Sequence, residues 1–509
     1  MNRLPPRLLL GMSLVVGLSL RLAYLADRPI WYDEAFSLLL ARRPVPELLA
    51  GTAADTMPPL YYLLLKGWLA FGESIAYARL MNVFLGVGLI GLAYVLGRAY
   101  FQPQAGAWAA ILLAVSPFLI YHAQELRMYT LLAVALAGYA WACQRMIGLI
   151  GRDEGGLLGA IWPVTACAAV ALYTHNLAIF TLVVPNLVLL LRRRWAEQRA
   201  LLVAQGTALL FFTPWLVLVP GQIQKIQAAF WTPQPGLLEL VQAIVSLHVN
   251  LPVADSLIPV VVFGSLLAIV LVAYGVVRGR DQLRWMPLGF MLLPPALLWI
   301  TSYLMRPVFV PRAFILSLVA YALVVGLLIV RPPLRGLGWV LLVVMLATAA
   351  IGLPSFYTFR SFPRSPFDQA AERLSASVGA GDRIVHDNKL SYFPMVIYRP
   401  DLPMAFLADE PGSHNDTLAH ESAAALGLTP QPDIESATEG APAVWFVVFQ
   451  RAIDEHRQLG KGEHPAIAWL TDHYTLVGQE AVGDLWLLHF GPPVRAELTS
   501  TQPVGWMLP

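Results

Sequence analysis

Long apolar stretches constrain this chain more than any other feature of its sequence. They recur from Leu8 to Pro354, and a stretch of about 17 to 25 apolar residues crosses a hydrocarbon core of roughly 30 Å as a helix. We predict about eleven spans, at residues 7–26, 77–97, 105–121, 127–147, 157–174, 176–191, 200–219, 258–277, 285–304, 312–330 and 336–353. The sequence therefore predicts a polytopic α-helical membrane protein.

Composition and charge support this class and exclude others. The 509 residues are 57% hydrophobic and 13% charged, whereas soluble domains average about 25% charged residues. The formal net charge is +2 and the basic residues are spread over loops, so we predict no nucleic-acid partner. Cys143 and Cys167 both lie inside apolar runs, which excludes a disulfide framework or a cysteine zinc site.

The amino-acid composition of the chain changes after the last predicted span. From about Phe359 onward polar residues are frequent, and short β-rich runs such as "DRIVHDN" and "AVWFVVFQ" alternate with helical segments. This alternation predicts a C-terminal soluble α/β domain. We divide the chain into a membrane domain, 1–355, and a soluble domain, 356–509.

Several ionisable residues of the soluble domain can form a second site. They are His386, Asp387, Asp409, Glu410 and His414. We favour a solvated loop surface for them, and expect this domain to recognise an acceptor or act as a structural lid.

Basic residues gather on one side of the predicted topology. They are Arg3, Arg7, Arg98, Arg145, Arg152, Arg192, Arg193, Arg194, Arg199, Arg278, Arg280, Arg284, Arg331 and Arg335. The positive-inside rule makes this side cytoplasmic, together with the N-terminus. The C-terminal domain is then extracytoplasmic.

Three segments on the outer side are expected to lie at the membrane interface. Residues 34–50 carry apolar side chains at helical spacing, which predicts an interfacial helix. Residues 57–71 are apolar for less than a full span and predict a partial helix. The loop 220–257 contains Trp231 and another amphipathic segment, which we expect to roof a cavity, and we expect its His248 to be solvated.

Ionisable residues of five loops meet on the same outer side. Asp33 and Glu34 follow the first span, and Asp55, His122, Glu125, Arg127, His175, Arg306 and Arg312 lie in the other four loops. The first pair alone can simply cap the helix that follows it. Together with the other loops, it indicates a cavity suited to a transfer that needs a base and a clamp for an anionic leaving group.

An ordered series of motifs resembles the GT-C superfamily of membrane glycosyltransferases. The motifs are "WYDEAFS", "PPLYY", "ARLMNVFLGVG", "SPFLIYHAQELRMYTLL", "LYTHNLAIF" and "PRAF", between about residues 20 and 330. Their order is similar to that of family 39, the group of the protein O-mannosyltransferases and the aminoarabinose lipid A transferases. Each motif is weak by itself, and the series is specific to superfamily level.

The resemblance implies catalytic roles for three carboxylates. The family's first acidic residue falls on Asp33, which it identifies as the general base, with Glu34 beside it. The second acidic position is best matched by Glu125.

The resemblance also implies which residues bind the donor phosphate and substrate. They are Arg79, Arg127, His175, Arg312, Tyr61 and Arg306. Ala313 replaces the Tyr of the family's "PRY" motif, and Met57 stands where the lipid A transferases have a Lys. His175 can instead satisfy a backbone carbonyl, and Arg306 can be an ordinary loop cation.

These assignments imply an inverting sugar transfer from a polyprenyl phosphate to an acceptor hydroxyl of a lipid, glycan or protein, at the outer face of a bacterial cytoplasmic membrane. Some related enzymes hold a divalent ion, which leaves an ion near Asp33 and Glu125 open. The chain has no Asp-x-Asp pattern and no paired zinc-ligand histidines, so we predict no obligate metal or cofactor. The alternatives are a transporter or lipid flippase, and a non-catalytic envelope assembly protein.

Overall fold

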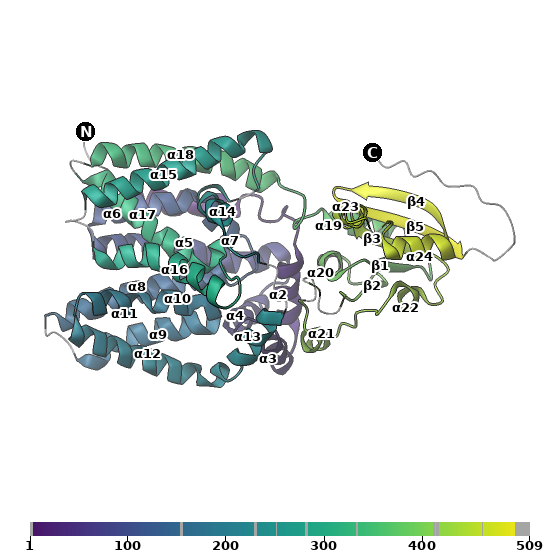
Figure 1. Cartoon of the computed structure of the whole chain (residues 1–509), viewed down its shortest axis with the longest axis horizontal. Helices are drawn as coiled ribbons and strands as arrows, with labels where there is room; N and C mark the ends of the chain where they lie inside the picture. Colours follow the sequence, from purple (N-terminus) through teal and green to yellow (C-terminus); the bar gives the residue numbers. More distant parts are fainter. Residues whose placement is uncertain are drawn as a thin grey trace. The chain divides into compact units, whose positions relative to one another are not determined.

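The computed structural model describes residues 4–152, 156–228, 232–250, 252–279, 284–331, 334–410, 413, 417–460 and 462–493. It contains two compact units (Figure 1). The membrane unit comprises Met1–Arg28, Asp33–Phe359 and Glu410–Leu428, and the C-terminal unit comprises Pro29–Tyr32, Arg360–Asp409 and Thr429–Pro509. The main division lies close to the predicted boundary, and each unit also contains a short segment from the other part of the chain.

The membrane unit is helical throughout. Its elements are α1 (Pro6–Leu22), α2 (Tyr32–Arg42), α3 (Val45–Ala54), α4 (Leu60–Leu69), α5 (Ile75–Tyr100), α6 (Pro103–Val115), α7 (Pro117–Ala123), α8 (Tyr129–Ile150), α9 (Leu157–Thr174), η1 (Asn176–Ala178), α10 (Ile179–Leu182), α11 (Val184–Leu191), α12 (Trp195–Leu216), α13 (Val219–Ala228), α14 (Leu237–Val249), η2 (Asp255–Leu257), α15 (Ile258–Arg278), α16 (Trp285–Leu304), η3 (Pro311–Phe314), α17 (Ile315–Val330), α18 (Arg335–Thr358) and α21 (His420–Ala425).

Every predicted span coincides with a helix or a broken helix. Among the described residues, seven helices are long and apolar enough to cross a membrane, or eight if the bent pair α6 and α7 is one span. The predicted spans 7–26, 157–174 and 176–191 correspond to shorter helices or, for the last, to the pieces η1, α10 and α11. The polytopic fold class is confirmed, with fewer full-length spans than the eleven predicted.

Proline breaks two segments that were predicted as continuous helices. The predicted interfacial helix 34–50 is two helices, α2 and α3, because Pro44 disfavours helical geometry at the residue before it. The predicted span 105–121 bends by 65° between α6 and α7. There Ser116 is extended and Pro117 begins the new helix, with the Ser116 hydroxyl accepting a hydrogen bond from the amide of Leu119.

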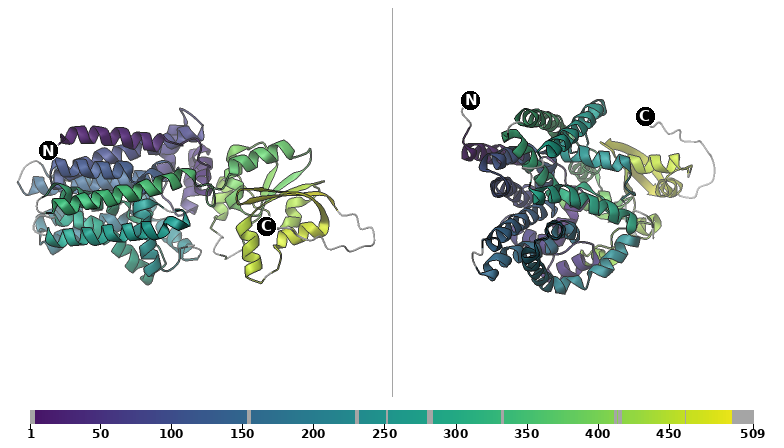
Figure 2. Two further views of the ribbon diagram at one scale, coloured as in Figure 1. Left: turned by 90° about the horizontal axis from the view of Figure 1, so that it is seen from above. Right: turned by 60° about the vertical axis from the view of Figure 1, so that its left-hand side comes forward.

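Close helix packing builds the interior of the membrane unit. Every residue of α17 is buried, and this helix packs against α6, α16 and α18. A Cβ atom on Gly326 would lie 2.3 Å from the carbonyl oxygen of Ala105, and one on Gly97 would lie 2.3 Å from the Cα atom of Gly106. Glycine at these positions lets the backbones of α5, α6 and α17 approach closely, as small residues do between membrane helices. The N-terminal helix α1 runs alongside α5 and α6 (Figure 2).

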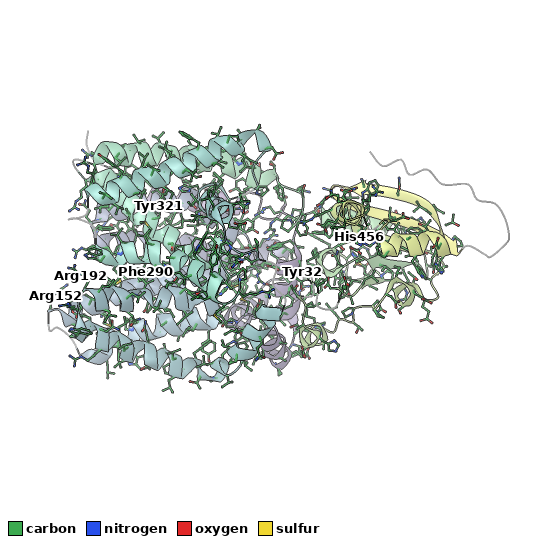
Figure 3. All side chains as sticks on the ribbon, in the orientation of Figure 1. Tyr32, Arg152, Arg192, Phe290, Tyr321 and His456 are labelled. Carbon is green, nitrogen blue, oxygen red and sulfur yellow. The ribbon has the colours of Figure 1, made fainter. Side chains whose placement is uncertain are left out.

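Basic loops and the short helices of the candidate site lie at opposite ends of the helical bundle. Arg152 and Arg192, from two of the basic loops, lie at one end of the membrane unit (Figure 3). The short helices α2, α4 and α7 lie at the other end of this unit (Figure 1). The arrangement agrees with the predicted separation of basic loops from the loops that carry Asp33 and Glu125.

The C-terminal unit is built on a mixed five-stranded sheet. Its elements are α19 (Phe367–Ser377), β1 (Arg383–His386), α20 (Lys389–Tyr398), β2 (Met404–Phe406), α22 (Ile434–Thr438), β3 (Val444–Phe449), α23 (Gln450–Gln458), α24 (Pro465–His473), β4 (Tyr474–Val482) and β5 (Leu485–Pro493). The strand order is β2-β1-β3-β5-β4, with β1 parallel to β2 and β3, and β5 antiparallel to β3 and β4. The predicted α/β character is confirmed.

Strand periodicity divides the core of this unit into two layers. Along β3, Phe446 and Val448 belong to one apolar cluster, and Val447 and Phe449 belong to the other. This is the alternation expected when both faces of a strand are buried. Gly483, with φ of +64°, supplies the positive φ that the two-residue hairpin between β4 and β5 requires.

Candidate active site

The two adjacent carboxylates of α2 have different surroundings. Both lie in the first turn of this helix. The side chain of Asp33 is 23% exposed, and its Oδ2 atom lies 3.6 Å from Nε of Arg127. The side chain of Glu34 is fully buried and forms an ion pair with Arg79. Of the two, only Asp33 is open to an incoming molecule.

The Glu34–Arg79 pair joins four parts of the membrane unit, namely α2, α5, the turn after α1 and the α7–α8 turn. The Nε and Nη2 atoms of Arg79 each donate to the Glu34 carboxylate at 3.0 Å. Nη1 of Arg79 donates to the carbonyl oxygens of Leu25 (2.8 Å) and Arg28 (2.9 Å), and the Leu126 amide donates to Glu34 Oε1 (3.0 Å). This fork geometry satisfies both buried charges. Arg79 was predicted to bind substrate; the structure places it in a closed network away from solvent.

The turn between α7 and α8 carries Glu125 and Arg127. Asn82 of α5 fixes this turn, because its side-chain amide donates to the carbonyl oxygens of both residues, at 2.9 Å for Arg127. The Tyr61 hydroxyl accepts from the same amide at 3.2 Å. Asn82 was not singled out from the sequence, although it follows Arg79 by three positions in "ARLMN" and therefore lies on the same helix face.

Glu125 is buried in a polar pair with His122. Its Oε2 atom lies 3.0 Å from Nδ1 of His122, and its Oε1 atom accepts from the Tyr121 hydroxyl at 3.4 Å. Glu125 is 1% exposed and His122 is 4% exposed. The carboxylate is thus held in a fixed orientation close to Arg127.

Arginines dominate the neighbourhood of Asp33. Arg127 is 7% exposed and donates through Nη1 to the Tyr62 hydroxyl at 3.4 Å. Arg312, from η3, lies over the ring of Tyr129 at 5.3 Å and interacts electrostatically with Asp33 and Glu125. Two guanidinium groups and one accessible carboxylate therefore share one region, assembled from α2, the α7–α8 turn and η3.

His175 lies beside these arginines as a neutral ring. Its ring is 5.8 Å from that of Tyr129, and its Nδ1 atom accepts a hydrogen bond from the amide of Leu177 at 3.0 Å. Burial, with the charges of Arg312 and Arg127, lowers the pKa of His175 to about 3. Because Nδ1 is an acceptor, the neutral ring carries its proton on Nε2 and is a hydrogen-bond donor there. The bond that it makes is to a backbone amide and not to the carbonyl considered from the sequence.

The remaining predicted site residues occupy different positions. Tyr61 is fully buried and bonded to Asn82, whereas its neighbour Tyr62 reaches Arg127. Arg306 is half-buried in the loop that follows α16, and its role stays a prediction.

The described side chains do not assemble a metal site. No group of three or more His, Cys, Asp or Glu side chains that could hold an ion occurs in the described part of the chain. The Glu125 carboxylate is already engaged by His122 and Tyr121. The ion that the resemblance leaves open near Asp33 and Glu125 therefore has no complete ligand set among these residues.

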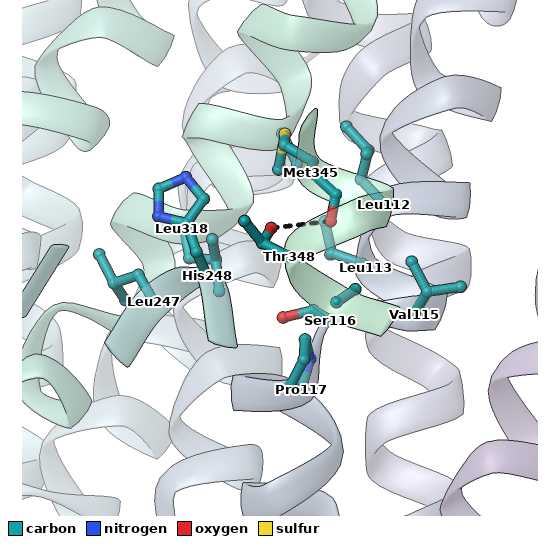
Figure 4. A pocket seen from close by; sticks show the side chains of 12 residues that line it. Leu112, Leu113, Val115, Ser116, Pro117, Leu247, His248, Leu318, Met345 and Thr348 are labelled. Carbon is teal, nitrogen blue, oxygen red and sulfur yellow. Dashed lines mark hydrogen bonds between the residues drawn. The ribbon is translucent and has the colours of Figure 1, made fainter. Parts of the chain in front are cut away.

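An apolar pocket lies between α6, α7, α14, α17 and α18 (Figure 4). Its volume of about 20 Å³ is enough for about one water molecule. The pocket is therefore too small to bind a sugar or a lipid phosphate. His248 lines the pocket and is buried, with Nδ1 2.8 Å from the carbonyl oxygen of Ile244 and Nε2 3.1 Å from the Tyr321 hydroxyl. The prediction of a solvated His248 was wrong, because α14 packs against α7 and α18. Trp231 lies outside the described residues.

The possible second site of the C-terminal unit is also more buried than expected. His386 is fully buried, which lowers its pKa to about 3, and its Nδ1 atom lies 3.0 Å from the Ser391 hydroxyl. Asp387 lies 3.1 Å from Nε2 of His464, and Asp409 pairs with Lys389. Glu410 is exposed and belongs to the membrane unit, and His414 lies outside the described residues. A solvated surface was wrong for His386, because β1 is an inner strand.

The fold is similar to that of solved membrane proteins. The apo crystal structure of ArnT from Cupriavidus metallidurans matches with a TM-score of 0.58 and 13% identity, over 94% of this chain and 97% of that one. ArnT bound to undecaprenyl phosphate gives 0.55 and 14%, over 97% and 99%. The oligosaccharyltransferase AglB from Archaeoglobus fulgidus, in complex with an inhibitory peptide and a dolichol-phosphate, gives 0.53 and 10%, over 92% and 72%. The chain therefore shares the fold of these proteins, which agrees with the fold expected from the motifs.

The chain matches no protein-family model and no curated protein.

The Glu34–Arg79 pair predicts a strong non-additive effect on stability. Glu34→Gln or Arg79→Met alone leaves one buried charge unpaired, which costs about 3 to 5 kcal/mol. The double variant should lose much less than the sum of the two. Thermal melting of the purified protein in lipid nanodiscs measures this, with Glu455→Gln of the exposed Arg451–Glu455 pair as a control that should melt like the wild type. Additive losses would show that the two side chains do not depend on each other.

His175 predicts a pH dependence of stability with a definite sign. The unfolded chain binds a proton at His175 below about pH 6.5, whereas the folded protein does so only near pH 3. Stability should therefore fall as the pH falls through this window. Between pH 7 and pH 4.5, the melting temperature of wild type should drop further than that of His175→Gln, which keeps an N–H donor but does not titrate. Equal drops would mean that His175 titrates in the folded protein as it does in the unfolded chain.

Proposed function

We propose that this protein is a glycosyltransferase that moves a sugar from a polyprenyl phosphate to an acceptor hydroxyl. The main observation is one solvent-accessible carboxylate, Asp33, whose Oδ2 atom lies 3.6 Å from Nε of the buried Arg127. Asp33 also interacts electrostatically with the half-buried Arg312. Support also comes from the fold, since structures of similar fold were solved with undecaprenyl phosphate or dolichol-phosphate bound.

Asp33 is the general base of the proposed reaction. The acceptor oxygen attacks the anomeric carbon of the donor sugar as its proton passes to the Asp33 carboxylate. The bond between that carbon and the phosphate oxygen breaks, and polyprenyl phosphate leaves with the bonding electron pair. Attack from the face opposite the phosphate inverts the anomeric centre. General bases placed in this way contribute about 10²- to 10⁴-fold to rate.

Arg127 and Arg312 stabilise the charge that develops on the leaving phosphate. Guanidinium groups suit this role because their fork matches two phosphate oxygens. Both groups are oriented in advance, the Arg127 guanidinium by the Tyr62 hydroxyl and the Arg312 guanidinium by the ring of Tyr129, while Asn82 holds the backbone carbonyl of Arg127. Such preorganised charge does not have to reorganise during the reaction. The neutral His175 adds a hydrogen-bond donor at the same place.

The other two acidic residues have supporting roles in this proposal. Glu34 fixes the first turn of α2, and so the direction of Asp33, through Arg79. Glu125 holds the α7–α8 turn and balances the charge of the arginines. The reaction takes place at the face opposite the basic loops, which the positive-inside rule makes extracytoplasmic.

Replacing Asp33 tests the proposal directly. Asp33→Asn should lower sugar transfer by about 10²-fold or more, because the amide cannot accept the acceptor proton. Undecaprenyl phosphate linked to mannose or to aminoarabinose serves as donor, an envelope extract from cells lacking the protein serves as acceptor, and mass spectrometry measures the released undecaprenyl phosphate.

Glu47→Gln is the matched control. Glu47 is an exposed acid in the same stretch between α1 and α4, and its replacement should leave transfer unchanged. Binding of undecaprenyl phosphate should persist in both variants. Undiminished transfer by Asp33→Asn would rule out the general-base role.

A further inference from the structure

The four residues that precede Asp33 belong to the C-terminal unit. Pro29–Tyr32 groups with Arg360–Asp409 and Thr429–Pro509, although the chain on both sides of it belongs to the membrane unit. No sequence pattern predicted that residues 29–32 group with the C-terminal unit. The segment therefore links the soluble part of the chain to the residue that we propose as general base.

Two polar contacts hold the backbone of this segment. The Ile30 amide donates to the Tyr398 hydroxyl at 2.9 Å, and Nη1 of Arg364 donates to the Pro29 carbonyl oxygen at 3.0 Å. Ile30 is fully buried, and Arg364 is 2% exposed. Removing the partner of a buried backbone group lowers the stability of the folded protein, because the group is left without a hydrogen bond.

Two aromatic contacts hold its side chains. The guanidinium of Arg364 lies 5.8 Å from the ring of Trp31, within the range of a cation–π interaction. The ring of Tyr32 meets that of Phe393 edge-on at 5.0 Å, a geometry that aromatic pairs favour. All four residues of the segment are buried or half-buried.

The membrane unit fixes the chain immediately before and after this segment. Arg79 donates to the carbonyl oxygen of Arg28 and pairs with Glu34. Between these two fixed points the chain runs through residues 29–32, whose backbone is held by Tyr398 and Arg364. Asp33 follows Tyr32 directly, so a shift of the segment moves the backbone of the base.

We propose that Tyr398 and Arg364 of the C-terminal unit are positioning residues for Asp33. They act by holding residues 29–32, and through the backbone they set where the Asp33 carboxylate stands. The inference rests on the proposed function of Asp33. It gives the C-terminal unit a part in the reaction in addition to the acceptor recognition expected from the sequence.

The proposal predicts a loss of turnover without a loss of donor binding. A displacement of about 1 Å in a catalytic group can cost up to about 10²-fold in rate. The proposed phosphate contacts belong to Arg127 and Arg312, which lie in the membrane unit and outside the segment 29–32. The turnover number should therefore fall about tenfold in Tyr398→Phe, with an unchanged KM for undecaprenyl-phosphate mannose or aminoarabinose.

Hydrogen exchange gives a second readout that is independent of activity. In the full-length protein in lipid nanodiscs, deuterium uptake of peptides covering residues 29–34 should rise about fivefold in rate in Tyr398→Phe, as expected for the loss of one hydrogen bond. Arg364→Met should raise it as well, and serves as a second variant if the first fails to fold.

Tyr474→Phe is the matched control. Tyr474 is buried in the same unit and donates its hydroxyl hydrogen to the carbonyl oxygens of Thr438 and Ala441. Its loss should leave both the exchange of residues 29–34 and the turnover number unchanged.

The outcomes separate this inference from the proposed function. Unchanged exchange of residues 29–34 in both Tyr398→Phe and Arg364→Met overturns the inference, whatever the activity. Faster exchange with an unchanged turnover number overturns it too, because Asp33 would then not depend on the segment. If the wild type transfers no sugar, the proposed function fails, and the exchange rates alone decide whether the C-terminal unit orders residues 29–34.

Discussion

The buried ion pair of Glu34 and Arg79 holds the site together. Two charges removed from water are tolerated only when geometry and further hydrogen bonds compensate for their lost hydration. Here the Arg79 guanidinium also binds two carbonyl oxygens in the turn that follows α1, and the Glu34 carboxylate also accepts a hydrogen bond from the amide of Leu126. One pair therefore fixes α1, α2, α5 and the α7–α8 turn with respect to one another.

This constraint explains why adjacent carboxylates have different tasks. Consecutive residues of a helix project about 100° apart, so Glu34 can face the interior while Asp33 stays accessible. The buried residue fixes the backbone, and the accessible residue is available for chemistry. Arg127 and Arg312 then supply positive charge beside Asp33, as the proposed departure of a phosphate requires.

Much of the fold and part of the site could be predicted from the sequence. Helix positions follow from the length of the apolar runs, and the order of the motifs indicated the GT-C fold. The grouping of Asp33 with Arg127 and Arg312 followed from topology, because loops on one side of a bundle share a surface. Which carboxylate is buried depends on the rotation of α2, which a two-residue pattern does not encode.

Other features depend on tertiary contacts that leave little trace in one sequence. Asn82 looks like an ordinary polar residue in an apolar helix until the α7–α8 turn is placed beside it. His248 looks solvated until α14 packs against the bundle. Residues 29–32 belong to the C-terminal unit through contacts between positions more than 300 residues apart, for example Pro29 and Arg364 (|i−j| = 335). No local sequence pattern indicates such a contact.

The most direct measurement of the central claim is a cryo-electron microscopy structure of the full-length protein in nanodiscs with undecaprenyl phosphate. We expect density for the phosphate within hydrogen-bonding distance of Arg127 and Arg312, with the Asp33 carboxylate facing the space beside it. A phosphate bound elsewhere, with Asp33 and both arginines turned away from it, would rule out this site as the place of sugar transfer.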